Sequence, residues 1–144
     1  FSVADLEKVP RPLTEAVLER LPHVVQVLWS DPSDSDADMA RGVHGNPRGP
    51  GIIRFGPDVT QRFCRANRIN LIVRSHQFVP HGYCFMHGGR LITLFSARNY
   101  FPAEPNDGAI LLIAEDENGH LRVRAKRLHH SVTTHTPNTM SERL

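Results

Sequence analysis

An apolar run that stops at a histidine constrains this chain more than any other stretch. Leu71-Ile-Val is followed at once by Arg74-Ser75-His76, and a polar residue, Gln77, comes next. Such a run predicts a buried strand, and α/β proteins place their chemistry where strands of this kind end. His76 is therefore a candidate functional residue. From the pattern alone it is either a hydrogen-bonded core histidine or a ligand.

Two hairpins are predicted after this strand. Residues 83–87 and 90–96 are extended runs joined by Gly88-Gly89, and residues 109–115 and 120–128 repeat the arrangement across Asn118-Gly119. Glycine pairs and Asn-Gly pairs are typical of tight hairpin loops. In the last run apolar and basic residues alternate, which predicts one buried face and one wet face.

Helices are predicted mainly before the strand. Ser2 and Asp5 have the spacing of a capping box, Thr14 can cap a second helix that runs through Leu21, and Gly56-Pro57-Asp58 begins a third that runs to about Arg68. Residues 23–30 are apolar enough to be buried, and Asp31-Pro32 is a turn signal. Residues 33–51 predict a surface loop, and residues 129–144 a disordered tail.

Composition excludes several classes of function. The formal net charge of this 144-residue chain is only +2, too small to argue for nucleic acid. A basic nucleic-acid strip at residues 122–130 is a weaker alternative, because strand alternation explains those residues more simply. No apolar run approaches the length of a membrane span. We therefore expect no nucleic-acid or membrane partner.

The cysteines and histidines indicate the cellular compartment of the protein and argue against a structural zinc site. Cys64 and Cys84 lie in a predicted helix and a predicted strand, which favours two reduced thiols and an intracellular protein, cytoplasmic or nuclear. The other histidines are expected on the surface, and their spacing does not suit a structural zinc site. They are His81, His87, His120, His129, His130 and His135.

Four motifs occur in a recognisable order: Leu28-Trp-Ser-Asp-Pro32, Phe55-Gly-Pro-Asp-Val-Thr60, Arg74-Ser75-His76 and Ser96-Ala-Arg-Asn-Tyr100. Together they resemble the carboxyl-terminal half of the phosphoprotein phosphatase family, which comprises metal-dependent serine/threonine phosphatases of the calcineurin-like metallophosphoesterase superfamily. The resemblance covers residues 1–128. The family's earlier metal motifs, Gly-Asp-x-His-Gly, Gly-Asp-x-x-Asp-Arg-Gly and Gly-Asn-His-Glu, do not occur in this sequence.

The resemblance implies an α/β fold that forms part of the metallophosphatase β-sandwich, with flanking helices, a mixed sheet and two carboxyl-terminal hairpins. The expected domain is residues 1–128, with a loop at 33–51. One sheet of the sandwich, with its packed helices, is expected here. A face is then left without its partner, so we expect the isolated chain to be poorly soluble or partly molten.

The resemblance also assigns roles to individual residues. The family's histidine at the position of His76 ligates one of two divalent metal ions, here expected to be Mn, Fe or Zn. An Arg-Gly pair contacts the substrate phosphate, which implies Arg48, with Arg41 as the alternative. Tyr100 is expected to reach substrate phosphate or metal-bound water. Trp29 and Asp31 are expected along the cleft. Apart from the resemblance, Arg74 is expected to be an ion-pair partner that shapes the end of the strand before His76.

The implied function is hydrolysis of phosphoserine and phosphothreonine on proteins by a metal-activated water. No catalytic residue is expected within this segment, because the family's general acid belongs to the motifs that do not occur here. We therefore expect the chain alone to be inactive. Phosphoproteins, and regulatory subunits or a fused regulatory domain, are the expected partners. The alternative function is a non-catalytic, phosphatase-like binding module.

Overall fold

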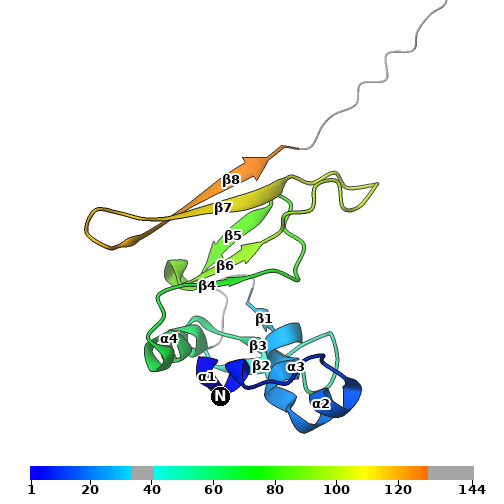
Figure 1. Ribbon diagram of the computed structural model, residues 1–144. Helices are drawn as coiled ribbons and strands as arrows, with labels where there is room; N and C mark the ends of the chain where they lie inside the picture. The colour runs from blue at the N-terminus through cyan, green and yellow to red at the C-terminus, as the bar shows by residue number, and fades with distance from the viewer. Residues whose placement is uncertain (34–40, 130–144) are drawn as a thin grey trace, which may run out of the picture.

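The computed structural model describes residues 1–33 and 41–129 (Figure 1). Part of the predicted loop, residues 34–40, and almost all of the predicted tail lie outside the described residues. The described part has mixed α/β structure, as the sequence predicts. Its helices are α1 (Val3–Glu7), α2 (Glu15–Arg20), α3 (Pro22–Trp29) and α4 (Pro57–Asn67).

The predicted capping signals mark most helix starts. The amide of Ser2 donates to the Asp5 carboxylate over 2.7 Å and the amide of Asp5 donates to Ser2 Oγ, so the capping box at α1 is confirmed. Thr14 stands at the N-cap of α2, but its side chain makes no capping hydrogen bond. Gly56 and Pro57 begin α4, which ends at Arg68 in a left-handed conformation.

The strands of the described part form three small sheets instead of the one expected sheet. The first contains β1 (Asp31–Pro32), β3 (Ile53–Phe55) and β2 (Val43–Gly45). The second contains β4 (Ile72–Arg74), β6 (Leu91–Leu94) and β5 (Tyr83–Met86), and the third is the β7 (Gly108–Glu115) and β8 (Leu121–Leu128) hairpin. The sheets stay separate because β3 does not pair with β4, and β7 pairs with β8 rather than with β6.

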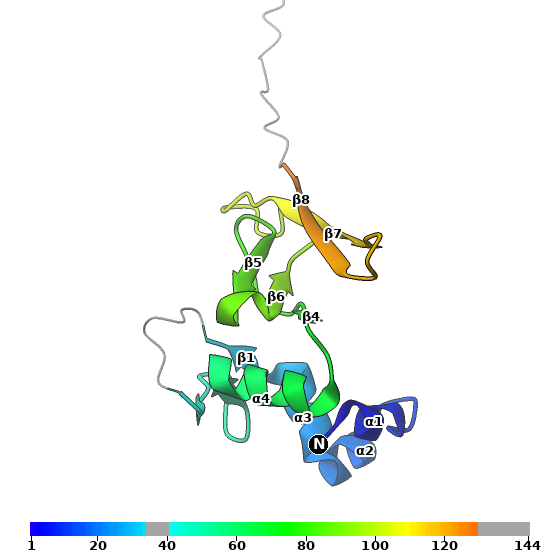
Figure 2. The ribbon, with the colours of Figure 1, turned by 90° about the vertical axis from the view of Figure 1, so that its left-hand side faces the viewer.

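Both predicted hairpins are confirmed. β5 and β6 pair antiparallel around the short 3₁₀ turn η1 (His87–Gly89), with Tyr83 opposite Leu94. β7 and β8 pair over their full length, from Gly108 opposite Leu128 to Glu115 opposite Leu121. Figure 2 shows the second hairpin at the end of the molecule away from the helices.

The predicted central strand is present but lies at a sheet edge. β4 has only three residues, of which Ile72 and Val73 belong to the apolar run, and Val73 is 44% exposed. The reason is that β4 has one hydrogen-bonded neighbour, β6, which pairs with it in parallel. The central strand is β6, where Leu91 and Ile92 are fully buried.

Three further expectations were wrong. The apolar segment 23–30 forms most of α3, in which only Val24 is buried, whereas Val27, Leu28 and Trp29 are 43–48% exposed. Asp31-Pro32 is a strand parallel to β3 and not a turn. Part of the predicted 33–51 loop, Val43–Gly45, is a strand, because it pairs antiparallel with β3.

One histidine that was expected on the surface is buried. His87 is only 3% exposed, its Nδ1 lies 2.8 Å from Thr60 Oγ1, and its ring packs edge-on against Phe55. The turn η1 packs against α4, and this contact removes the imidazole from water. The thiols Cys64 and Cys84 are both free, as predicted.

Candidate functional site

The carboxyl ends of the two parallel strands β4 and β6 bring the candidate loops to one edge of their sheet. Arg74, the last residue of β4, lies opposite Thr93 near the end of β6. His76 follows β4 by two residues, and Tyr100 lies in the loop that follows β6. Parallel neighbours necessarily present their following loops at the same edge, so sequence-distant candidates approach each other here.

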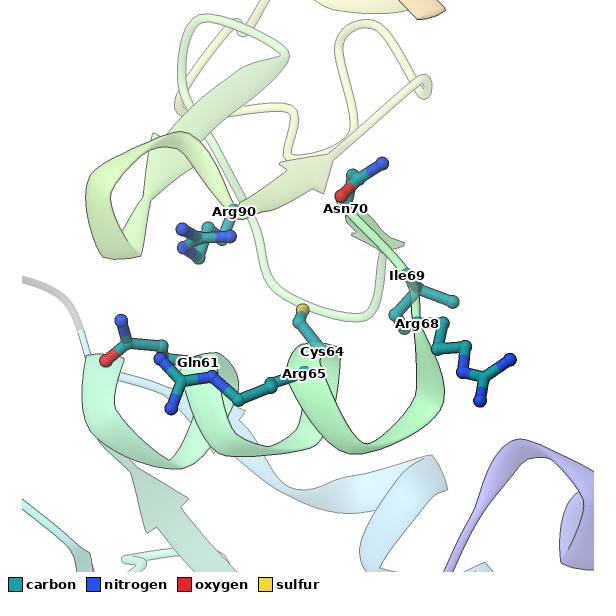
Figure 3. Close-up of a pocket in the computed structure, with 7 residues that line it drawn as sticks. All are labelled: Gln61, Cys64, Arg65, Arg68, Ile69, Asn70 and Arg90. Carbon is teal, nitrogen blue, oxygen red and sulfur yellow. The ribbon is translucent and has the colours of Figure 1, made fainter.

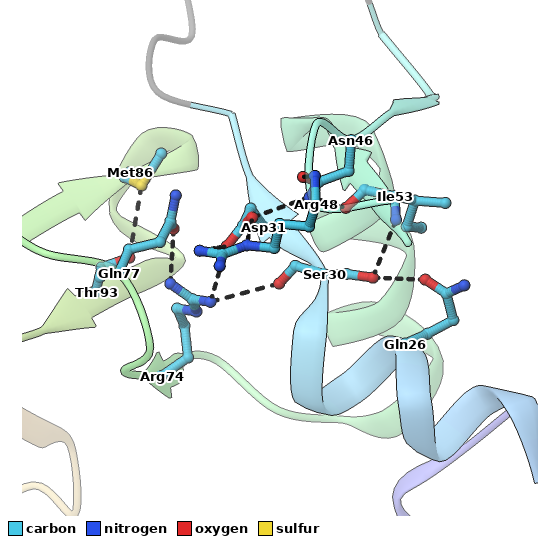
Figure 4. A network of polar contacts seen from close by, with 10 residues as sticks. All are labelled: Gln26, Ser30, Asp31, Asn46, Arg48, Ile53, Arg74, Gln77, Met86 and Thr93. Atoms are coloured by element: carbon cyan, nitrogen blue, oxygen red, sulfur yellow. Dashed lines mark hydrogen bonds and ion pairs between the residues drawn. The ribbon is translucent and has the colours of Figure 1, made fainter. Parts of the chain in front are cut away.

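Asp31 is the centre of the polar network at this edge (Figure 4). Its carboxylate accepts hydrogen bonds from Arg48 Nε at 2.7 Å, Asn46 Nδ2 at 2.9 Å and Arg74 Nη2 at 3.3 Å. The Asp31 side chain is only 8% exposed. A carboxylate at this depth is stable because two guanidinium groups and an amide replace its water.

The network also holds Arg74 in position. Its guanidinium donates to Gln77 Oε1 at 2.6 Å and to the Ser30 carbonyl at 3.4 Å, in addition to Asp31. Burial lowers the pKa of Arg74, while Asp31 acts in the opposite direction. The prediction that Arg74 forms an ion pair and shapes the end of its strand is confirmed by this geometry.

His76 stands beside this network with an exposed side chain. Its backbone has φ = 83°, an uncommon left-handed conformation, and its ring meets Trp29 edge-on at 5.1 Å between centroids. Desolvation and the positive charges of Arg48 and Arg74 lower the pKa of His76. This favours the neutral imidazole, which is the form that can bind a metal ion.

Tyr100 lies in an aromatic cluster rather than in the polar network. Its ring contacts Phe95 and Phe101 edge-on, at 5.2 Å and 4.9 Å between centroids, and the side chain is 58% exposed. Phe78, two residues after His76, packs against both Phe95 and Phe101. The cluster therefore joins the loop of His76 to the loop of Tyr100.

The two candidate arginines have different surroundings. Arg48 binds Asp31 and its side chain is 34% exposed, so it remains accessible at the edge of the network. Arg41 is exposed just before β2, next to Gly42, whose amide donates to Asp58 at the start of α4. The structure thus brings Arg48, and not Arg41, together with Asp31 and Arg74.

Two asparagines that were not among the predicted site residues help to build this edge. Asn46 binds both the Asp31 carboxylate and the Ile53 carbonyl, and its Oδ1 accepts from the Arg48 amide. Asn106 is 1% exposed and ties the Tyr100 amide to the Ala97 carbonyl. The Asn46-Pro47 pair is a turn signal that points to the first residue, whereas no local pattern marks the second.

A metal centre is not complete within the described residues. They contain no group of three or more His, Cys, Asp or Glu side chains that could hold a metal ion. His76 is one imidazole in an accessible position, and Asp31 is already neutralised by two arginines. These residues alone do not fit a two-metal site. Separately, none of the described helices is long and apolar enough to cross a membrane.

Comparisons with known proteins show relatives of one kind. The chain is 41% identical over 114 residues to serine/threonine-protein phosphatase BSL2 of Arabidopsis thaliana, which is 79% of this chain and 11% of that protein. It is 35% identical over 120 residues to mouse serine/threonine-protein phosphatase with EF-hands 2, which is 83% of this chain and 15% of the relative. No family model matches the sequence.

A solved structure supports the same relationship. It is a protein serine/threonine phosphatase from Saccharomyces cerevisiae with similarity to human phosphatase PP5, with a TM-score of 0.62 and 28% identity. The match covers 92% of this chain and 40% of that one. The chain therefore spans less than half of the solved structure and only 11–15% of those two curated relatives. By sequence and by fold, the chain belongs to the phosphoprotein phosphatase family and corresponds to one part of its members.

Proposed function

We propose that this chain is the carboxyl-terminal part of a protein serine/threonine phosphatase catalytic domain and supplies one side of its substrate cleft. The observation that carries the proposal is the meeting of His76, Arg48 and Trp29 around Asp31 at one sheet edge, in a chain related to phosphatases. In this proposal the substrates are phosphoserine and phosphothreonine residues of proteins.

Each residue has a proposed task in that cleft. Arg48 directs a guanidinium at phosphoryl oxygens, because a planar fork can meet two of them at once. Asp31 and Asn46 fix Arg48 in position. The Asp31 carboxylate accepts from Arg48 Nε, and Asn46 Oδ1 accepts from the backbone amide of Arg48. Tyr100 offers a hydroxyl from the opposite loop, with its ring braced by Phe95 and Phe101.

His76 is proposed to donate its neutral imidazole to a divalent ion, with the remaining ligands supplied by polypeptide that this chain does not contain. Such an ion, of the Mn, Fe or Zn type, supplies activation of a water and neutralisation of phosphoryl charge. The roles of this chain's own residues are to hold and orient the phosphoryl group. We therefore infer that the 144-residue chain alone has no phosphatase activity.

The test compares the chain with a longer version that carries the missing metal motifs. Phosphate release from a phosphoserine peptide in the presence of manganese should be absent for the chain alone and present for the longer protein. In the longer protein His76→Ala should lower kcat/KM by at least about 100-fold, because a lost metal ligand costs no less than a lost supporting contact. His81→Ala, an exposed histidine on the same connection between β4 and β5, is the matched control.

Two results would contradict the proposal. Robust turnover by the chain alone would show that its own residues suffice for catalysis. An unchanged rate in the His76→Ala protein would remove the imidazole from the metal centre. If the longer protein also fails to release phosphate but still binds protein partners, the phosphatase-like binding module becomes the better account.

A further inference from the structure

A polar pocket lies at the amino ends of β4 and β6, whereas His76 lies beyond the carboxyl end of β4. It has a volume of about 350 Å³ and lies between α4 and the turn that follows β5 (Figure 3). It is lined by Gln61, Cys64, Arg65, Arg68, Ile69, Asn70 and Arg90. This lining contains three arginines and no acidic residue.

The helix wall of the pocket follows from sequence spacing. Four of the lining residues follow at intervals of three, one and three positions, which places them along one stripe of α4 and its C-cap: Gln61, Cys64, Arg65 and Arg68. Cys64 is 1% exposed and forms the floor, with its thiol directed into the space in Figure 3. Arg68, at the helix end, lines the rim, and its side chain extends away from Arg65.

Arg90 forms the opposite wall, and its backbone is fixed from both sides. Its amide donates to the His87 carbonyl at 3.3 Å, and its carbonyl accepts from the Ile72 amide at 2.9 Å. The first contact belongs to the turn η1, and the second to the start of β4. The backbone of Arg90 is therefore fixed opposite α4, and its exposed side chain starts from a defined position.

The positive charge in this pocket is not balanced by neighbouring carboxylates. In the described part of the chain, neither Arg65 nor Arg90 forms an ion pair, whereas Arg62 on the same helix binds Asp58 at 3.0 Å. Burial raises the pKa of the Cys64 thiol, despite the opposing charge of Arg90, so the thiol remains neutral and supplies no counter-charge.

We propose that this pocket binds a phosphate group between Arg65 and Arg90. Guanidinium groups bind phosphate oxygens with charge-assisted hydrogen bonds, and the amides of Gln61 and Asn70 provide neutral donors at the rim. No aromatic side chain lines the pocket, so stacking on a nucleobase has no support here. The ligand class is therefore a small phosphate or phosphomonoester and not a nucleotide.

The site differs from the proposed cleft in position and in residues. It lies where Asn70 leads into β4 and where Arg90 leads into β6, at the amino ends of the two parallel strands. His76 follows the carboxyl end of β4. Phosphate in this pocket therefore cannot be the phosphoryl group that meets Arg48.

Isothermal titration of the 144-residue chain, at constant ionic strength and at a temperature below the onset of its unfolding, tests the proposal with inorganic phosphate, O-phosphoserine and acetate. Phosphate or phosphoserine should bind with saturation, and the tighter of the two identifies the natural source. Arg90→Ala should weaken binding by about tenfold, the equivalent of one charge-assisted hydrogen bond. Arg65→Ala should do the same, and because Arg65 is an exposed residue of α4, this variant is expected to keep its fold.

Arg62→Ala is the matched control, because it removes the same charge from the same helix outside the pocket. It should leave the affinity nearly unchanged. The proposal is overturned if neither phosphate species binds, if acetate binds equally well, or if Arg65→Ala and Arg62→Ala have equal effects. Binding that is lost in Arg48→Ala but retained in Arg65→Ala and Arg90→Ala would also overturn it, because it would place the phosphate in the cleft.

Discussion

At the scale of single residues, Asp31 shows how a buried charge depends on its partners. Burial alone would raise the pKa of its carboxyl group, but hydrogen bonds from Arg48 and Asn46 and the charge of Arg74 lower that pKa below its ordinary value of 3.8. Because the folded-state pKa is lowered, ionised Asp31 stabilises the fold at pH values above about 4. That contribution disappears as the pH falls through the lowered pKa.

We predict that Asp31→Asn loosens the pairing of β1 with β3. The substitution leaves Arg48 and Arg74 without their shared counter-charge, which costs about 2 kcal/mol or more. Amide exchange at Ser33, which donates to the Phe55 carbonyl, should accelerate by roughly 30-fold near pH 7 after correction for intrinsic rates. The difference from the native chain should shrink below pH 4.

Glu19→Gln is the control for this prediction, because it neutralises an exposed carboxylate on α2. Exchange at Ser33 should not change in that variant. Equal protection of Ser33 in the Asp31→Asn and native chains would show that β1 is held by backbone pairing alone.

At the scale of elements, the connection between β6 and β7 is an ordered loop although it contains little regular structure. Asn106 organises it: its side chain accepts from the Tyr100 amide at 2.8 Å and donates to the carbonyls of Ala97 and Asp107. Gly108 follows, and a side chain there would lie 2.3 Å from the Ser96 carbonyl oxygen. The position of this loop therefore depends on the side-chain amide of Asn106 and on the absence of a side chain at Gly108.

We predict that Asn106→Ala releases this loop. Three hydrogen bonds are lost and buried backbone groups remain unsatisfied, at a cost of about 1–3 kcal/mol. Protection of the Tyr100 amide against hydrogen exchange should fall about tenfold or more, while that of the Ile92 amide in β6 stays constant. Asn118→Ala, in the exposed hairpin turn, should change neither. Unchanged protection at Tyr100 would mean that the aromatic cluster alone holds the loop.

At the scale of the whole molecule, much apolar surface faces water. A groove of about 480 Å³ between α1, α3, α4 and the strands β3 and β4 has a mainly apolar lining, including Phe55, Phe63 and Ile72. The second hairpin is a two-stranded sheet in which Leu112, Ile113 and Leu121 are at least half exposed. Isolated two-stranded sheets are marginal in water, and apolar patches of this kind favour association.

We predict that the chain alone binds an apolar fluorescent dye such as anilinonaphthalene sulfonate and unfolds over a broad temperature range. Both properties follow from apolar surface without a partner and from loose packing around it. Dye fluorescence and calorimetry measure them directly. A cooperative melt at high temperature without dye binding would show that the described contacts are sufficient for a rigid fold.

The order of motifs and the local signals allowed much of this protein to be predicted. Capping at Ser2, the helix that begins at Pro57, the glycine-rich turns and the His76 loop follow from interactions between residues close in sequence. Such interactions depend on spacing alone. The sequence also predicted that Arg74 is an ion-pair partner at the end of its strand, although it did not identify Asp31 as the other residue.

Tertiary structure decided what depends on distant neighbours. It made β6 rather than β4 the central strand and buried His87 against α4. It also gathered Asp31, Asn46, Arg48 and Arg74 from three separate segments. Burial and charge pairing are properties of which segments meet, and spacing along a chain does not encode them. The sequence by itself therefore determined the family and the elements with strong local signals, whereas packing determined the short strands β1 and β2 and which polar groups share a site.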